Sequence, residues 1–229
     1  DNLPRDGLFR IQTPQAFHID AILAAHRGWP DGREATDDAQ MLRHAGQDVA
    51  MIQGSPMLEK ITHPQDFAAA AARHDASLIS RSATGFDVHR IEAGEELWLG
   101  GVHIPHDKGL SGHSDADVAL HAITDALLGT IGAGDIGMHF PPSDPQWRGA
   151  ASARFLEHAA GLVAAQGGVI DFVGLTLIGE APKIGPHRDA IRASIAAILR
   201  LPIARVSVKA TTTEKLGFTG RGEGMAAQA

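Results

Sequence analysis

The sequence contains no cysteine, and this absence excludes disulfide bonds and thiolate metal ligands. Any metal ion must therefore be held by histidine and carboxylate side chains, and the chain has 13 histidines. The sequence also lacks a run of 18 apolar residues and a signal-peptide pattern. We therefore predict a soluble, unsecreted, cytoplasmic protein without a membrane partner.

Positive charge is scarce too: 20 lysines and arginines stand against 27 acidic residues, which gives a formal net charge of -7. That balance argues against nucleic acid or an anionic membrane surface as a partner. The 229 residues, 44% of them apolar, suffice for one large domain or for a domain with part of another. Because the chain begins at Asp1 without Met and ends without a clear end signal, we expect a fragment of a longer protein.

The first eighty residues show alternating helix and strand signals. We predict helices over 15–28, 35–46 and 62–76 and a short strand over 48–54. Thr36 or Asp37 can cap the second helix, and Pro64 suits the first turn of the third. The alternation is typical of an α/β domain, but one strand is too few to form a sheet of its own.

A different pattern begins after this region. Residues 77–85 are predicted to be a linker, so we divide the chain into domains over 1–80 and 81–229. Beyond the linker we predict strands over 84–91, 169–179 and 204–213, a hairpin with a Gly-Gly turn over 95–105, and helices over 112–129, 152–167 and 186–202. Long helices follow strands, which predicts an α+β fold with helices covering one face of a sheet.

A candidate metal site comes from two of these elements. In "FDVH", Asp87 and His89 are two residues apart on a predicted strand and so point to the same side. On the predicted helix "GHSDADVALHAITDALLG", His121 shares a face with Asp117 and Asp125, each four residues away. Asp87, His89 and His121 would form a site of nitrogen and oxygen ligands with one open position, as in catalytic zinc sites. Asp125 could accept the second ring N–H of His121 and select its tautomer.

Simpler explanations fit the same residues. An Asp-x-His pair on a strand is commonly a surface or hydrogen-bonded pair, and a helical histidine is commonly solvated. Ser114 or Asp115 can be the N-cap of the helix, which would account for the segment around His113 without a ligand. A helix N-terminus also binds anions well, so both explanations stay open.

Two glycine-rich segments are equally ambiguous. The loop "GAGDIGMHFPPSD" (132–144) fits ordinary turn chemistry. The segment "KATTTEKLGFTGRGEG" (209–224) can be a surface loop, or its backbone N–H groups and hydroxyls can cradle phosphates while Glu214 holds a hard cation.

Taken together, the motifs are far more specific. "TGFDVHRI", "GLSGHSDADVALHAITDALLG", "GAGDIGMHFPPSD", "EAPKIGPH" and "VKATTTEKLGFTGRGEG" stand in the order found in 2-C-methyl-D-erythritol 2,4-cyclodiphosphate synthases of the non-mevalonate isoprenoid pathway. Residues 82–229 resemble nearly all of that domain. The resemblance implies a homotrimer with active sites between subunits. It also implies Zn²⁺ or another divalent metal on Asp87, His89 and His121, and Mg²⁺ or Mn²⁺ with the diphosphate on Glu214.

The same resemblance implies roles for further residues. His113 and Thr212 match catalytic positions that stabilise the transition state. Substrate contacts would come from Ser114, Asp135, Ile136, Gly137, Phe140, Asp144, Ala181, Lys183, Thr211, Thr213, Phe218 and Arg221. The loops around "APK" and "TTTE" would hold the cytidine nucleotide of a CDP-linked methylerythritol phosphate, with CMP as the product.

The first eighty residues resemble another enzyme of that pathway. "RDGLFRIQTPQAF", "TDDAQ" and "KITHPQDF" are similar to the C-terminal part of the cytidylyltransferase that makes diphosphocytidyl-methylerythritol. Arg5 and Lys60 match basic residues that bind substrate at its catalytic site. The family's Gly-rich nucleotide loop is not among these residues, and "PMLE" before Lys60 departs from its Asn-containing pattern. The resemblance implies a bifunctional enzyme, of which this chain holds the tail of an α/β nucleotidyltransferase domain and the cyclase.

We therefore predict a cyclase that releases CMP from its substrate. Two other functions remain consistent with the residues. A zinc phosphohydrolase would use the same metal trio with water as nucleophile and would need a general base near the open metal position. A non-catalytic nucleotide-binding or assembly module would bind no metal.

Overall fold

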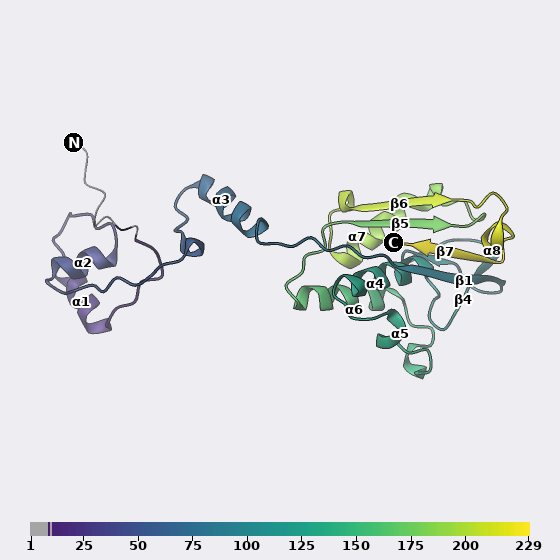
Figure 1. Ribbon diagram of the computed structural model, residues 1–229, viewed down its shortest axis with the longest axis horizontal. Coiled ribbons are helices and arrows are strands. Elements are labelled where there is room, and N and C mark those ends of the chain that lie inside the picture. The colour runs from purple at the N-terminus through teal and green to yellow at the C-terminus, as the bar shows by residue number, and fades with distance from the viewer. Residues whose placement is uncertain (1–8, 10) are drawn as a thin grey trace. The chain divides into compact units, whose positions relative to one another are not determined.

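The computed structural model describes Phe9 and residues 11–229, so the predicted substrate residue Arg5 lies outside the described residues. The chain forms two compact units, Asp1–Ile79 and Ser80–Ala229, and Figure 1 labels their α-helices and the strands of the larger sheet. Among the described helices, none has the length and apolar character needed to cross a lipid bilayer.

Short helices make up the regular structure of the first unit. They are α1 (Ile19–Arg27), α2 (Asp38–His44), the 3-10 turn η1 (Pro56–Leu58) and α3 (Pro64–Asp75). Asp37 caps α2 by accepting the N–H of Gln40 at 2.8 Å, which decides between the two predicted caps. Pro64 begins α3, as predicted.

The strand predicted over 48–54 is wrong, because the described residues of this unit include no strand. The backbone of Ser55 pairs instead with the side-chain amide of Gln12. Ser55 N–H donates to Gln12 Oε1 at 3.0 Å, and Gln12 Nε2 donates to the Ser55 carbonyl at 2.8 Å. Gly54 leaves room for this contact, since a β-carbon there would lie 2.1 Å from Gln12 Oε1. Ser55, which directly follows the predicted strand, thus satisfies its backbone groups through a side chain rather than through a neighbouring strand.

The second unit is built on a five-stranded mixed sheet with the strand order β4-β1-β7-β5-β6. Its strands are β1 (Phe86–Ala93), β4 (Lys108–Ser111), β5 (Val173–Ile178), β6 (Val206–Thr211) and β7 (Gly224–Gln228). β5 and β6 run parallel, and the other neighbouring pairs run antiparallel. The predicted hairpin is present as β2 (Trp98–Leu99) and β3 (Val102–His103). Its turn, Gly100 and Gly101, has positive φ angles of 61° and 76°.

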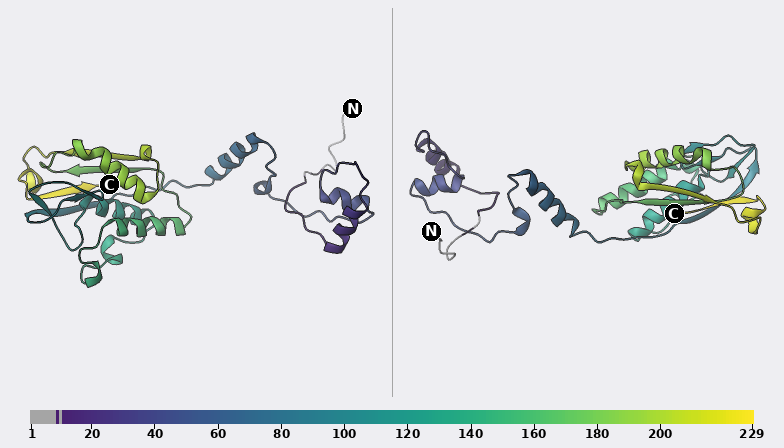
Figure 2. Two further views of the ribbon diagram at one scale, coloured as in Figure 1. Left: turned by 180° about the vertical axis from the view of Figure 1, so that it is seen from behind. Right: turned by 90° about the horizontal axis from the view of Figure 1, so that it is seen from above.

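Three longer helices lie against one face of this sheet (Figure 2). They are α4 (Val118–Thr130), α6 (Ala153–Ala165) and α7 (Arg188–Leu199). α4 packs on β1 and β7, α7 packs on β6, and α6 packs on the two other helices. Shorter elements are α5 (Ile136–His139), α8 (Gly217–Gly220) and the 3-10 turns η2 (Pro145–Trp147), η3 (Gly185–His187) and η4 (Ile203–Arg205). The predicted α+β class is confirmed.

The core between helices and sheet holds α4 in place. Its fully buried side chains include Leu120, Ile123, Leu128, Leu175, Leu177, Ile191 and Ile195. Burying a leucine or isoleucine side chain contributes about 1.5–3 kcal/mol relative to exposure. α4 and the sheet are therefore rigid supports for the polar residues that they carry between them.

Helix α4 begins later than the predicted helix over 112–129. Ser114 and Asp115 are not its N-cap, because the chain turns at Ala116, whose φ is 53°, before the helix starts. The cap is Asp117, whose carboxylate accepts the N–H groups of Ala119 and Leu120. The side chains ahead of the cap are thereby left free for other contacts.

Asp117 also fastens the hairpin to the helix. Its Oδ1 accepts the N–H of Gly100 at 2.9 Å, and its Oδ2 accepts the N–H of Gly101 at 2.6 Å. The side chain is completely buried, and burial raises the pKa of its carboxyl against the donors that lower it. One carboxylate therefore satisfies two turn amides and two helix amides in the interior.

Candidate metal centre and active site

Strand β1 carries two of the predicted ligands toward the helices. Asp87 and His89 are partly buried, whereas the alternate residues Phe86 and Val88 face the opposite side and are exposed. His89 Nδ1 lies 3.0 Å from the carbonyl oxygen of Ser111, which can only accept a hydrogen bond. Nδ1 therefore carries a proton, and in the neutral ring Nε2 presents its lone pair.

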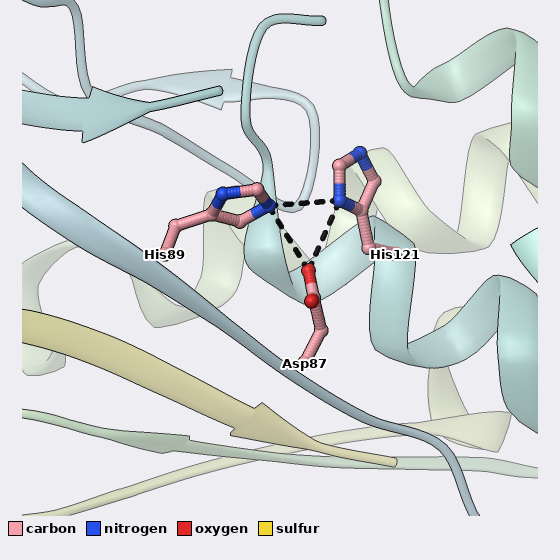
Figure 3. Close-up of side chains that lie close together, drawn as sticks. All are labelled: Asp87, His89 and His121. Carbon is pink, nitrogen blue, oxygen red and sulfur yellow. Dashed lines mark hydrogen bonds and ion pairs between the residues drawn. The ribbon is translucent and has the colours of Figure 1, made fainter. Parts of the chain in front are cut away.

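Helix α4 brings His121 to the same point, as Figure 3 shows. His121 Nδ1 lies 3.0 Å from Asp87 Oδ2 and 3.0 Å from His89 Nε2, and His89 Nε2 lies 3.1 Å from Asp87 Oδ2. Two atoms that each bind one zinc ion at about 2.0–2.1 Å in tetrahedral geometry are about 3.3 Å apart. The spacing and chemistry of the donors fit a shared divalent metal ion, and this is the one such group in the described part of the chain.

The electrostatics of this group also suit a cation. Burial by itself raises the pKa of Asp87, but the contacts with the His121 and His89 rings outweigh it and hold that pKa well below its usual range. Burial lowers the pKa of His89, and here the contacts with Asp87 and the Ser111 carbonyl outweigh it and raise that pKa. The Asp87 carboxylate is therefore ionised, and a metal ion competes with a proton at His89.

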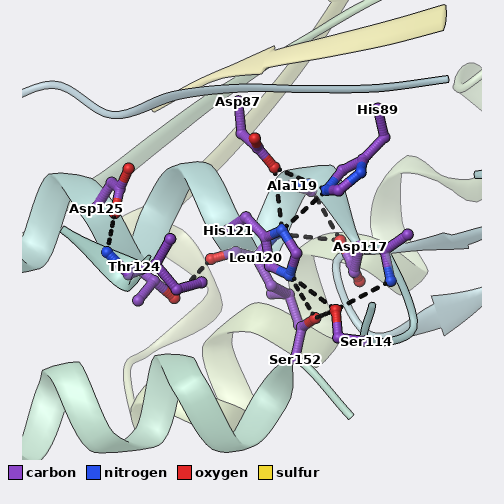
Figure 4. Close-up of polar contacts among 12 residues, drawn as sticks. Asp87, His89, Ser114, Asp117, Ala119, Leu120, His121, Thr124, Asp125 and Ser152 are labelled. Carbon is purple, nitrogen blue, oxygen red and sulfur yellow. Dashed lines mark hydrogen bonds and ion pairs between the residues drawn. The ribbon is translucent and has the colours of Figure 1, made fainter. Parts of the chain in front are cut away.

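The far side of the His121 ring is engaged by two hydroxyls (Figure 4). His121 Nε2 lies 2.8 Å from Ser152 Oγ and 3.2 Å from Ser114 Oγ. The prediction that Asp125 accepts this N–H is wrong: Asp125 accepts the backbone N–H of Ile136 at 2.7 Å. The helical spacing is as expected, but both ring nitrogens of His121 already have partners on other elements.

Asp125 instead anchors a segment that carries several predicted substrate contacts. Asp135 caps α5 by accepting the N–H of Met138 at 3.0 Å, and Ile136 and Gly137 form the first turn of that helix. The bond from Ile136 to Asp125 ties this turn to α4, the helix that carries His121.

The next predicted contacts lie in an aromatic cluster beside α5. Phe140 packs against Phe155 and Trp147, with ring centroids 4.3 Å and 4.9 Å apart. Asp144 caps η2, and its Oδ1 accepts the N–H of Gln146 at 3.1 Å.

The two predicted nucleotide loops are joined by a residue that the sequence analysis did not single out. Glu180 Oε1 accepts the N–H of Thr213 at 3.2 Å and the N–H of Lys215 at 3.3 Å. Ala181 and Lys183 follow Glu180 directly in the sequence. The one signal available in the sequence was an acidic residue adjacent to the "APK" motif.

The predicted second-metal ligand stands apart from the first donor group. Glu214 is exposed, lies three residues beyond Thr211, the last residue of β6, and has a φ of 53°. Its Oε1 accepts the hydroxyl of Thr212 at 2.8 Å. Among the described residues, Glu214 is not part of the group formed by Asp87, His89 and His121.

Two further predicted contacts lie near β7. Phe218, His89 and Glu223 help line a cavity of about 510 Å³. The guanidinium of Arg221 donates two hydrogen bonds to the Glu223 carboxylate, at 2.8 and 2.9 Å. His113 is exposed ahead of α4, and its carbonyl accepts the N–H of Gly149 at 2.7 Å.

Lys60 belongs to the first unit. It is exposed and helps line a smaller cavity of about 250 Å³ together with Thr62 and His63.

Comparison with known proteins assigns the family. Residues 80–229, more than half of the chain, match the model of the YgbB family. The chain belongs to the YgbB family. Residues 1–75 match the model of 2-C-methyl-D-erythritol 4-phosphate cytidylyltransferase. Both resemblances inferred from the motifs are thereby confirmed.

Relatives of this YgbB-family chain include a longer protein and solved structures. The chain is 65% identical over 229 residues to the bifunctional enzyme IspD/IspF of Rhizorhabdus wittichii, a match that covers 100% of this chain and 59% of that protein. The chain thus spans about three-fifths of the length of this relative.

Two solved structures are similar as well. A 2C-methyl-D-erythritol-2,4-cyclodiphosphate synthase in its CDP-bound form is 42% identical, with a TM-score of 0.60 over 65% of this chain and 96% of that one. The bifunctional IspDF from Campylobacter jejuni is 34% identical, with a TM-score of 0.62 over 99% of this chain and 60% of that one.

The YgbB-family unit also contains functional candidates that the sequence did not reveal. Ser152 and Asp115 contact each other behind His121, although 37 residues separate them in sequence. A serine at a helix start and an aspartate near one are ordinary capping residues. Only the packing of α6 against α4 shows that they meet at a metal-ligand candidate.

Proposed function

We propose that this chain converts 4-diphosphocytidyl-2-C-methyl-D-erythritol 2-phosphate to 2-C-methyl-D-erythritol 2,4-cyclodiphosphate and releases CMP. The observation that carries the proposal is the convergence of Asp87, His89 and His121 donor atoms within 3.1 Å of one another, in a chain of the YgbB family. The cyclodiphosphate synthase solved in its CDP-bound form supports a CDP-linked substrate.

The reaction needs positioning more than covalent catalysis. An oxygen of the 2-phosphate attacks the β-phosphorus in line, a new P–O bond closes the ring, and the bond from the β-phosphorus to the bridging oxygen breaks. CMP leaves with that electron pair. Such phosphoryl transfers have a loose transition state, so the protein mainly orients groups and neutralises charge. The attacking phosphate is already ionised near neutral pH, so no general base is required.

The metal ligands follow from the donor set. Asp87, His89 and His121 would hold Zn²⁺ or another divalent ion, and Glu214 would hold Mg²⁺ or Mn²⁺ beside the diphosphate. When bound, such ions polarise phosphoryl oxygens and offset the charge that develops on them. The contacts with the His121 and His89 rings already keep Asp87 ionised for this purpose.

The remaining residues bind and orient the substrate. His113 and Thr212 would donate hydrogen bonds to oxygens on which charge develops, an effect often worth about 10² to 10³ in rate. Ser114 and the first turn of α5 would hold the methylerythritol group. The "APK" and "TTTE" loops would hold the cytidine nucleotide. Glu180, which adjoins the first loop, accepts two N–H groups of the second and so ties the two loops together.

We further propose that the active unit is a homotrimer with its sites between subunits. Two features support this arrangement. Phe86 and Val88, on the face of β1 away from the helices, are 59% and 40% exposed and offer an apolar surface for another copy. Glu214 stands outside the donor group of its own chain, as expected if a neighbour completes the site.

Sedimentation at assay concentrations tests the assembly. We expect a trimer for the wild-type chain and dissociation for a variant with Phe86→Asp and Val88→Asp, because two charges then replace apolar contacts. An active wild-type monomer would rule the trimer out.

For the longer protein we propose two activities. Residues 81–229 would form the cyclodiphosphate synthase domain. Residues 1–80 would be part of a cytidylyltransferase domain that uses CTP and 2-C-methyl-D-erythritol 4-phosphate, with Arg5 and Lys60 binding the substrate phosphate. The match of residues 1–75 to that family supports the assignment.

Release of CMP from the CDP-linked substrate tests the cyclase proposal. We expect CMP at a rate well above the uncatalysed one, loss of at least about 10²-fold after dialysis against a chelator, and recovery with Zn²⁺ and Mg²⁺, because metal ions stabilise the phosphoryl charge. Undiminished CMP release by protein shown to be metal-free would contradict the proposed chemistry.

A further inference from the structure

Ser152 has an unusual position for an N-cap residue. It precedes α6, yet its side chain makes no capping hydrogen bond to that helix. The residue is completely buried, and its hydroxyl points to His121 Nε2 at 2.8 Å instead (Figure 4). An N-cap serine normally accepts a backbone N–H of the first helical turn, whereas this hydroxyl contacts the His121 ring.

Asp115 determines where the hydroxyl proton of Ser152 goes. Asp115 Oδ1 makes a short hydrogen bond with Ser152 Oγ, and Asp115 Oδ2 accepts the backbone N–H of Ser152 at 2.9 Å. A carboxylate only accepts, so Ser152 donates its single hydroxyl proton to Asp115. The lone pairs of Ser152 Oγ then face His121.

The tautomer of His121 follows from this arrangement. Ser152 Oγ can only accept from His121 Nε2, so Nε2 carries the ring proton. In the neutral ring Nδ1 is then unprotonated, and it lies 3.0 Å from Asp87 Oδ2 and from His89 Nε2. Ser114 Oγ is farther from Nε2, at 3.2 Å, and accepts the N–H of Ala116.

We propose that Asp115 and Ser152 are positioning residues that hold His121 in the tautomer with a free Nδ1, ready to bind a metal ion. The proposal rests on the metal site of the proposed function. Without the Ser152 hydroxyl, the Nε2 proton of His121 loses its nearest acceptor. The tautomer with its proton on Nδ1, which can donate to the Asp87 carboxylate, then becomes the more stable one. A metal ion must then displace that proton, and the loss of an outer partner of this kind costs about 10- to 100-fold in affinity.

Two disruptive substitutions and two matched controls separate this role from a purely structural one. Ser152→Ala removes the acceptor of the Nε2 proton. Asp115→Ala leaves the Ser152 hydroxyl free to turn and donate to Nε2, which also favours the wrong tautomer. Asp115→Asn is the shape-matched control, because its amide oxygen can still accept the Ser152 hydroxyl. Ser114→Ala removes the more distant hydroxyl and serves as the second control.

The test uses metal-free protein labelled with ¹⁵N-histidine. Long-range ¹H–¹⁵N correlation is expected to show the Nε2–H form of His121 in the wild type, Asp115→Asn and Ser114→Ala. It is expected to show an Nδ1-protonated ring in Ser152→Ala and Asp115→Ala. Zn²⁺ affinity, measured by competition with a chromophoric chelator, should fall about 10- to 100-fold in those two variants.

Two results would overturn the proposal: an unchanged Nε2–H tautomer in Ser152→Ala, or Zn²⁺ affinity within about twofold of the wild type. Because Asp115 has two further backbone contacts, Asp115→Ala can fail to fold, and the comparison of Ser152→Ala with Asp115→Asn then decides. Neither measurement depends on turnover. A chain with the expected tautomers but without cyclase activity would refute the proposed function and leave this inference standing.

Discussion

The His121→Ala variant is expected to lose its divalent metal ion and nearly all CMP release. Removing this imidazole leaves Asp87 and His89 as a two-donor group, which no longer matches a three-ligand catalytic site. The loss in affinity should exceed the about 10- to 100-fold that removal of an outer partner costs. Metal analysis of purified protein should give about one tightly bound ion per wild-type chain and close to none for the variant.

Asp125→Asn is the matched control on the same helix face. Asp125 contacts Ile136 rather than the His121 ring, so this variant should retain the metal. Wild-type metal affinity in His121→Ala would refute the ligand assignment, and loss of metal in Asp125→Asn would show that helix damage alone can empty the site.

Asp117→Ala is expected to destabilise the second unit by about 3–5 kcal/mol, because it leaves buried N–H groups without an acceptor. Those groups belong to Gly100, Gly101, Ala119 and Leu120. The loss is smaller than the sum of the four hydrogen bonds, because the variant also avoids the cost of burying a charged carboxylate. That cost is seen in the wild type as the raised pKa of Asp117. Urea unfolding of metal-free protein, followed by circular dichroism at one protein concentration, measures the change.

Two variants control for this result. Asp117→Asn keeps an oxygen where Oδ1 accepts three of the four N–H groups, so it should lose less than half as much stability. Asp189→Ala removes an aspartate whose side chain is 90% exposed and should change the free energy of unfolding by less than about 0.5 kcal/mol. An Asp117→Ala variant as stable as Asp189→Ala would mean that the hairpin is held by its apolar contacts alone.

Much of the fold and the central trio could be predicted because they follow local rules. A period of two on β1 places Asp87 and His89 on one side, whatever the rest of the chain does. The Gly-Gly turn of the β2–β3 hairpin is equally local. The meeting of β1 with His121 depends on packing across the sheet. The spacing of the residues made this meeting one possibility among simpler ones, and the family resemblance made it the specific expectation.

The errors arose where distant side chains compete with local preference. Helix propensity and capping signals favoured a start near Ser114, but the left-handed turn at Ala116 and the four bonds to Asp117 delay it. Helical spacing favoured Asp125 as the partner of His121, whereas Ser152, 31 residues away, occupies that position. Apolar character favoured a strand over 48–54, but a strand needs a neighbour, and sequence alone does not supply one.

The identity of the product tests the central claim most directly. Wild-type protein is incubated with 4-diphosphocytidyl-2-C-methyl-D-erythritol 2-phosphate and Mg²⁺, with and without chelator, and the products are followed by ³¹P NMR. The proposed reaction predicts two coupled phosphorus signals of a cyclic diphosphate together with CMP, and their absence in the chelated sample. A linear bisphosphate with CMP would show that water is the nucleophile, and a zinc phosphohydrolase would replace the cyclase.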